Sequence, residues 1–160
     1  MKSQTHSKGP FFITTDKSQL DTNVIHTFLT TDSYWWPKDT PKKLIIEAIQ
    51  NSILCYGVYV NDESVGDLKL IGFARVISDL VRFSWLCDVF ILPEFRGKGL
   101  SKWLVSVIVE HPKLSGTRFN LGTNDAHGLY EQFGFTPLQE PEKRMERAVD
   151  WEKIKVGYEK

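Results

Sequence analysis

The fold of this chain is decided by the stretch ILPEFRGKGLSKWL, residues 91–104. Its start continues an apolar run typical of a strand, and its end has the apolar spacing of a helix. Between the two, Gly97 and Gly99 allow a ligand to approach the backbone closely. Three cations add positive charge around this turn: Arg96, Lys98 and Lys102. The first amides of a helix have no internal partners and carry the positive end of the helix dipole, so the arrangement favours a phosphate-like anion.

The same spacing has a plain alternative, a loop that uses glycine only as a hinge. Two nucleotide motifs do not fit the stretch. A P-loop needs Ser or Thr after Gly97-Lys98, where Gly99 stands, and a dinucleotide fingerprint needs a third glycine where Lys102 stands. The stretch is therefore either an anion site of another kind or a structural turn.

Length and composition describe one ordinary globular domain. The chain has 160 residues, of which 41% are hydrophobic and 25% charged. Lys+Arg and Asp+Glu both number 20, and the resulting net charge of +0 argues against a broad grip on nucleic acid. No run has the length and apolar character of a membrane span, and the polar start has no signal-peptide core. Two cysteines make no disulfide framework, and the four histidines lack metal-ligand spacing. We expect a cytoplasmic protein without metal, membrane or nucleic-acid partners.

Periodicity predicts the elements on both sides of the opening stretch. Helices are expected at residues 18–31, 40–52, 101–111 and 125–133. Strands are expected at residues 11–15, 53–60, 68–78, 82–92 and 117–123, with two closing strands at 135–138 and 144–149. Residues 1–9 are expected to be a disordered tail, followed by one domain at 10–160. The predicted fold class is α/β, a mixed, mostly antiparallel sheet of about six or seven strands flanked by about four helices.

Two segments resemble motifs of one family, the GCN5-related N-acetyltransferases (GNAT). Arg96-Gly97-Lys98-Gly99-Leu100-Ser101 resembles the family's motif A, with Ser in place of the final Gly or Ala. Downstream, TNDAHGLYEQFGF (residues 123–135) resembles the family's Asn-x-x-Ala-x-x-x-Tyr-x-x-x-Gly-Phe segment, with Thr123 at the Asn position. Both motifs occur in the family's order. The resemblance implies a sheet with a V-shaped splay between the family's fourth and fifth strands.

The resemblance also implies acetyl-CoA as the acetyl donor. Its pyrophosphate would lie on the amides of motif A, and its pantetheine arm would lie along the preceding strand, because an open strand edge offers unpaired backbone groups. An amide of that strand would polarise the thioester carbonyl. The implied donor-binding residues are Val89, Phe90, Ile91, Arg96, Gly97, Lys98, Gly99, Leu100, Ser101, Lys102, Thr123, Asn124, Ala126 and Tyr130.

Direct transfer requires a neutral amine, although a free Lys-type amine has a pKa of about 10.4. Asp88 is the acidic side chain nearest the implied site, and it is read equally as a base or as a structural or substrate-orienting carboxylate. Alternation along a strand leaves open whether Asp88 faces the amine. Asp79 and Glu94 are weaker candidates for the base.

Tyr130 is the general acid that the resemblance implies for the leaving thiolate. A phenol with a pKa of about 10 protonates a thiolate, whose thiol has a pKa of about 8.5, only uphill by about 2 kcal/mol. We therefore expect Tyr130 to hold a hydrogen bond to sulfur as charge develops. The alternative is a tyrosine packed in the core.

Three adjacent aromatic residues, Tyr34, Trp35 and Trp36, stand where the family usually builds its acceptor pocket. They are read either as a wall for an apolar or cationic acceptor or as partly core. The predicted function is an N-acetyltransferase that acts on a small-molecule or peptide amine in a ternary complex, as a monomer or homodimer. A covalent route through Cys55 or Cys87 lacks a His partner in sequence, and the other class is a CoA-binding sensor without turnover.

Overall fold

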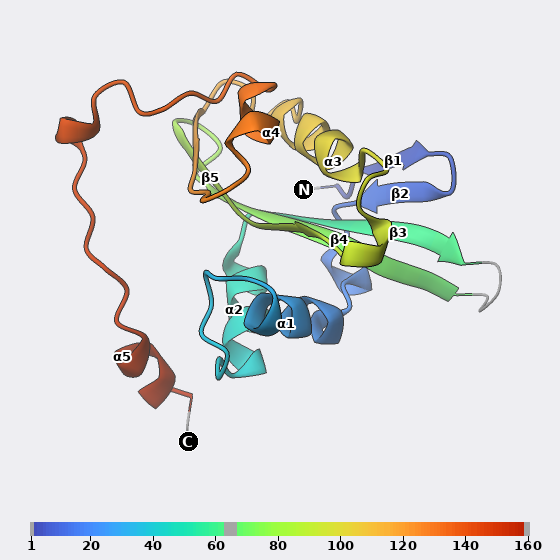
Figure 1. The fold of residues 1–160 in the computed structure, drawn as a ribbon, viewed down its shortest axis with the longest axis horizontal. Helices are drawn as coiled ribbons and strands as arrows, with labels where there is room; N and C mark the ends of the chain where they lie inside the picture. Colours follow the sequence, from blue (N-terminus) through green and yellow to red (C-terminus); the bar gives the residue numbers. More distant parts are fainter. Residues whose placement is uncertain (1, 63–66, 159–160) are drawn as a thin grey trace.

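One mixed sheet separates two layers of helices in the computed structural model, which describes residues 2–62 and 67–158 (Figure 1). In these residues the six strands lie in sequence order: β1 (Thr5–Lys8), β2 (Phe11–Thr14), β3 (Leu54–Asp62), β4 (Asp67–Ser78), β5 (Phe83–Ile91) and β6 (Arg118–Leu121). Neighbouring strands are antiparallel except β5 and β6, which are parallel. The helices are α1 (Thr22–Thr31), α2 (Lys42–Asn51), α3 (Leu100–Val109), α4 (His127–Glu131) and α5 (Trp151–Val156). The predicted α/β class and mostly antiparallel sheet are confirmed.

Two apolar cores hold the helices to opposite faces of the sheet. On one face α1 and α2 bury Ile25 and Ile45 against Phe73 and Phe90 of β4 and β5. On the other face α3 and α4 lie over a second core, to which α3 contributes the fully buried Leu104. Burial of this kind contributes about 25 cal/mol per Å² of apolar surface, so these contacts hold the helices against the sheet.

A register shift interrupts the pairing of β4 with β5. Phe73 pairs with Phe90 and Arg75 pairs with Cys87, so two residues of β5, Asp88 and Val89, stand opposite one residue of β4. Asp88 has a φ of 55°, which is uncommon for a residue other than glycine. The extra residue is a β-bulge, a feature that bends a strand and redirects its side chains.

The parallel pairing of β5 with β6 is short. It covers only the first four residues of β5, Phe83–Leu86 against Arg118–Leu121. The remainder of β5 keeps its partner β4 on one side and has no strand on the other among the described residues. Since β5 and β6 correspond to the family's fourth and fifth strands, the pairing ends where the family resemblance implied a splay.

Two sequence predictions about the ends of the domain are wrong. Residues 1–9 were expected to be disordered, but Thr5–Lys8 form β1 and pair with Phe11–Thr14. Closing strands were expected at 135–138 and 144–149, but within the described chain neither segment forms a strand. Residues 136–150 are instead an exposed arm that carries one short 3₁₀ turn at Pro141–Lys143 (Figure 1).

The arm ends in α5, which returns to the layer formed by α1 and α2 (Figure 1). The amine of Lys155 lies 2.6 Å from the carboxylate of Asp39, and the hydroxyl of Tyr158 donates to Glu47. None of the helices in the described part of the chain combines the length and apolar character that a bilayer crossing requires.

Gly72 lies opposite Ile91 beside the bulge and tests how tightly the strands pack there. A methyl group at Gly72 would lie 2.5 Å from Ile91 Cδ1 and 2.8 Å from the Phe90 carbonyl oxygen. We expect Gly72→Ala to lower the free energy of unfolding by about 1–3 kcal/mol, measured by urea denaturation, because a packed core resists added volume. Gly116→Ala is the matched control, since a methyl group there meets no atom within 4 Å. Equal stability of the two variants would contradict tight packing at the bulge.

Candidate functional site

The turn between β5 and α3 has the geometry of an anion cradle. Gly97 and Gly99 have φ values of 75° and 71°, and a side chain at either would point into open space. The amide of Trp103 donates to the Gly99 carbonyl at 3.0 Å, so the amides before it precede the first bond of the helix. A pocket of about 230 Å³ covers this turn, and its lining residues are Ile91, Phe95, Arg96, Gly97, Gly99, Leu100, Ser101, Lys102 and Leu129.

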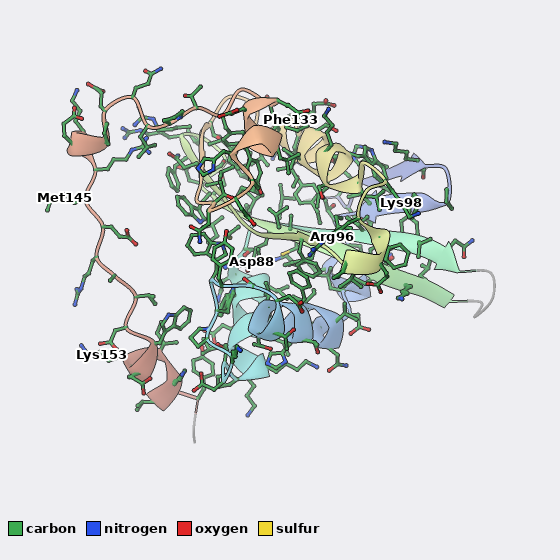
Figure 2. All side chains as sticks on the ribbon, viewed as in Figure 1. Asp88, Arg96, Lys98, Phe133, Met145 and Lys153 are labelled. Carbon is green, nitrogen blue, oxygen red and sulfur yellow. The ribbon has the colours of Figure 1, made fainter. Side chains whose placement is uncertain are left out.

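The cations around the turn have different roles. Arg96 donates from Nε to the Ile91 carbonyl at 3.1 Å, so its side chain closes the turn back onto the end of β5. Lys98 and Lys102 are exposed near the start of α3. Figure 2 shows Lys98 beside the turn that leads into this helix. The structure therefore provides one cation that shapes the cradle and two that can meet a ligand from solvent.

The open edge of β5 leads directly into this cradle. Val89, Phe90 and Ile91 follow the last pair between β5 and β6, and they belong to the half of β5 that lies beyond it. The side chain of Phe90 is buried and stacks on Phe28 of α1, with ring centroids 4.0 Å apart. Phe90 can therefore offer a ligand mainly its backbone, which is how an open strand edge binds an extended chain.

Asp88 is held by two side chains in the interior. Its carboxylate pairs with the guanidinium of Arg75, and the other oxygen accepts a hydrogen bond from Trp36 Nε1 at 2.9 Å. The side chains of Asp88 and Arg75 are 4% and 11% exposed. Figure 2 shows Asp88 on the side of the sheet that faces α1 and α2. The bulge turns Asp88 toward Arg75, which the regular alternation of a strand could not have indicated.

The three aromatic residues of the loop between α1 and α2 reach across the splay. Trp36 contacts Asp88 of β5, whereas the hydroxyl of Tyr34 accepts a hydrogen bond from the Asn124 amide at 3.0 Å, just after β6. Trp35 lies against Gly122, where a Cβ atom would be 3.4 Å from its ring and 4.0 Å from Trp85. About half of the Tyr34 and Trp35 surface is exposed, so the loop forms an open aromatic wall.

Sequence reasoning missed two residues that lie beside this wall, Arg75 and Trp85. Arg75 was detectable in principle, because a charged residue inside the apolar run IGFARVI needs a buried partner. Trp85 carried no signal beyond being an aromatic residue in a predicted strand. The weaker acidic candidates lie elsewhere: Asp79 accepts three backbone amides of the β4–β5 turn, and Glu94 pairs with Lys69 at 3.5 Å.

Tyr130 lies in α4, in the core that supports α3. It is 7% exposed, and its ring meets Phe135 edge-on with centroids 5.8 Å apart. Burial raises the pKa of Tyr130 to about 12, so the phenol is protonated at any ordinary assay pH. The hydroxyl of Thr123 accepts a hydrogen bond from the Ala126 amide at 3.0 Å and so stabilises the turn that leads into α4.

Neither cysteine has the environment of a nucleophile. Burial raises the pKa of the Cys55 thiol to about 11 and that of the Cys87 thiol to about 12. A thiolate is the reactive form, and both groups are almost fully protonated at neutral pH. In the described residues, no cluster of His, Cys, Asp and Glu could hold a metal ion.

Comparison with known proteins agrees with this geometry. The family model described as an acetyltransferase (GNAT) domain matches residues 52–137. A "Putative acetyltransferase" of Gibberella zeae is 31% identical over 121 residues, which is 68% of this chain and 68% of that protein. A crystal structure from Xanthomonas campestris pv. campestris, described in the same terms and as belonging to the GNAT family, is 46% identical. It covers 91% of this chain and 94% of its own, with a TM-score of 0.77.

A more distant structure shares the fold alone. It is a "predicted acetyltransferase with acetyl-CoA" from Clostridium acetobutylicum, 13% identical, covering 95% of this chain and 97% of its own with a TM-score of 0.59. The ligand in that structure belongs to that protein, and the similarity extends here to the path of the backbone.

The raised pKa values of the two cysteines predict slow alkylation of the native protein. We expect iodoacetamide at mildly alkaline pH to label Cys55 and Cys87 at least about 100-fold more slowly than in concentrated urea, because the native thiolate fraction is so small. Mass spectrometry after incubation with acetyl-CoA should show no acetylated cysteine. Rapid native labelling of one cysteine, or a stable acetyl-cysteine, would restore the covalent route.

Proposed function

Because the chain belongs to the GNAT family of acetyltransferases, we propose that it transfers an acetyl group from acetyl-CoA to a primary amine within a ternary complex. The observation that carries the proposal is the open edge of β5, which runs into the glycine turn at the start of α3. An extended pantetheine arm and a pyrophosphate require these two features in this order. The Clostridium acetobutylicum neighbour, whose structure includes acetyl-CoA, supports the choice of donor.

The donor would be held mostly by backbone groups. The amides of residues 97–102 would bind the pyrophosphate, with Lys98 and Lys102 supplying charge, while residues 89–91 would pair with the pantetheine arm. Thr123, Asn124 and Ala126 begin the segment before α4 and would border the same arm. An amide of β5 would donate to the thioester oxygen as negative charge develops there.

Acetyl transfer breaks the thioester bond and forms an amide, and it releases one proton from the amine and one thiolate. The raised pKa of Tyr130, about 12, makes complete proton transfer to a thiolate uphill by about 5 kcal/mol. We propose that Tyr130 donates a hydrogen bond to the sulfur while the bond breaks, and that the thiolate takes its proton from solvent or from the amine. Both oxygens of Asp88 already accept hydrogen bonds, one from Arg75 and one from Trp36. Asp88 would therefore orient the acceptor side of the site rather than act as the base.

The acceptor would lie against Tyr34, Trp35 and Trp36, whose faces suit an apolar group or a cation. Small-molecule and peptide amines both fit an open wall. Neutral net charge gives no basis for a nucleic-acid acceptor. The cytoplasmic setting, and the choice between monomer and homodimer, stay predictions.

A second candidate function is favoured by the engagement of Asp88. A carboxylate that is already paired is a poor base, and a site without a base could bind CoA or acetyl-CoA as a sensor without turnover. Tight CoA binding together with no transfer to any amine would favour this function over the first.

Charge reversal at Lys98 tests the position of the pyrophosphate. We expect Lys98→Glu to raise the dissociation constant of CoA about tenfold in calorimetry, because the change replaces attraction by repulsion near several phosphate charges. The effect should shrink as salt is added. The matched control is Lys113→Glu, an exposed lysine beyond the other end of α3. Equal loss of affinity in both variants would argue against a phosphate at the glycine turn.

Release of CoA in the presence of a panel of amines tests the reaction, with Tyr130→Phe as its probe. We expect this variant to lower turnover about 10- to 100-fold, the range for losing a hydrogen bond to a charged group, with little change in the KM for acetyl-CoA. Because the pKa of Tyr130 is about 12, the variant should lower the whole pH profile without moving its limbs. An unchanged turnover would remove Tyr130 from the mechanism.

A further inference from the structure

The C-terminal helix α5 contacts the acceptor loop through a tryptophan that the proposed chemistry does not use. The ring of Trp151 lies 5.4 Å from that of Trp36, centroid to centroid, with an angle of 47° between the planes. Lys155, one turn further along α5, pairs with Asp39 in the same loop at 2.6 Å. Two side chains of α5 thus contact residues 36–39.

The covalent chain does not impose this docking. Residues 136–150, which precede α5, are exposed throughout, and Figure 2 shows Met145 at the far side of the arm. A helix of six residues does not hold its shape alone in water. The order of α5 therefore depends on what it touches, and Trp36 is its aromatic partner.

Trp36 transmits the contact to the bulge of β5. Its Nε1 donates to Asp88 Oδ1 at 2.9 Å, and the guanidinium of Arg75 lies 5.8 Å over its ring. Asp88, with a φ of 55°, lies two residues after Leu86, the last residue of β5 that pairs with β6. A shift of the Trp36 indole would therefore alter both the aromatic wall and the hydrogen bond that holds Asp88.

We propose that Trp151 is a positioning residue of the acceptor half of the site, an inference that rests on the proposed function. Its ring fixes the indole of Trp36, and through it the carboxylate of Asp88 at the bulge of β5. The donor turn at residues 97–102 follows the other end of the open half of β5. Removal of Trp151 should therefore weaken binding of the acceptor amine without weakening binding of acetyl-CoA.

Hydrogen exchange of the unliganded full chain tests the mechanical part of this proposal. We expect Trp151→Ala to speed amide exchange in peptides covering residues 85–91 about two- to tenfold, the range for losing one aromatic pair, while β3 is unchanged. Trp151→Phe should restore slow exchange. The matched control is Val156→Ala, because Val156 is 61% exposed on the same helix. Unchanged exchange at 85–91, or an equal acceleration in the control or in β3, would overturn the proposal.

A double-mutant cycle tests whether the effect passes through Trp36. Trp36→Phe keeps an aromatic ring beside Trp151 but removes the donor to Asp88. In that background Trp151→Ala should add little to the exchange rate at 85–91, because the connection is already broken. Full additivity of the two changes would show that Trp151 acts by another route and would overturn the proposal.

Kinetics with the amine that releases CoA fastest from the panel complete the test. Trp151→Ala should raise the KM for that amine about two- to tenfold and leave the KM for acetyl-CoA unchanged, with rescue by Trp151→Phe. An equal rise in both KM values would overturn the proposal.

Calorimetry with acetyl-CoA on the wild-type protein distinguishes failure of the proposed function from failure of the proposed role of Trp151. Absence of binding rejects the proposed function, whereas the exchange experiments still decide the role of Trp151.

Discussion

The buried ion pair between Arg75 and Asp88 lies at the point where β4 and β5 lose register, and the rest of the site depends on it. A residue with a positive φ is unfavourable unless its surroundings hold it there. Arg75 holds the Asp88 carboxylate, and removing either partner would leave the other charged and buried, which typically costs about 3–5 kcal/mol. Such a pair typically adds little to net stability, but here it joins the bulge of β5 to β4. The pair therefore acts as a geometric constraint rather than as a source of stability.

The bulge in β5 and the splay between β5 and β6 together shape the proposed site, which has a donor side and an acceptor side. Among the described residues, β5 has no strand on its β6 side beyond Leu86, so no strand pairs with its backbone there and an extended ligand could do so. On the donor side, the gap ends at the glycine turn and the first amides of α3. On the acceptor side, the loop between α1 and α2 bridges the gap, because Trp36 contacts β5 while Tyr34 contacts the chain after β6. The same divergence of strands thus exposes the donor edge and gives the aromatic loop its place.

Sequence reasoning succeeded where structure depends on local backbone signals. Gly97, Gly99 and the apolar spacing after them indicated the turn and α3, and the structure starts α3 at Leu100. It failed where tertiary contacts decide the conformation. The polar residues of β1 have no apolar alternation of their own and are ordered by pairing with β2. Residues 144–149 were expected to form a closing strand, but within the described chain this segment pairs with no strand and is exposed. The bulge at Asp88 required knowledge of Arg75 and Trp36, which lie far away in sequence.

The difference between backbone and side-chain recognition explains why the sequence predicts a donor site and does not predict the acceptor. A pyrophosphate and an extended arm bind amides and carbonyls, so the chain needs only glycine, a helix start and an open edge at fixed spacing, and these leave a local motif. An amine acceptor meets side chains, and here they come from the loop at 34–36, from β4 and from α5, separated by dozens of residues. Each of these segments can change its side chains without disturbing the donor turn. Proteins with this fold can therefore share a donor while differing in acceptor, and in this chain the side chains around the proposed acceptor side come from the aromatic loop, β4 and α5.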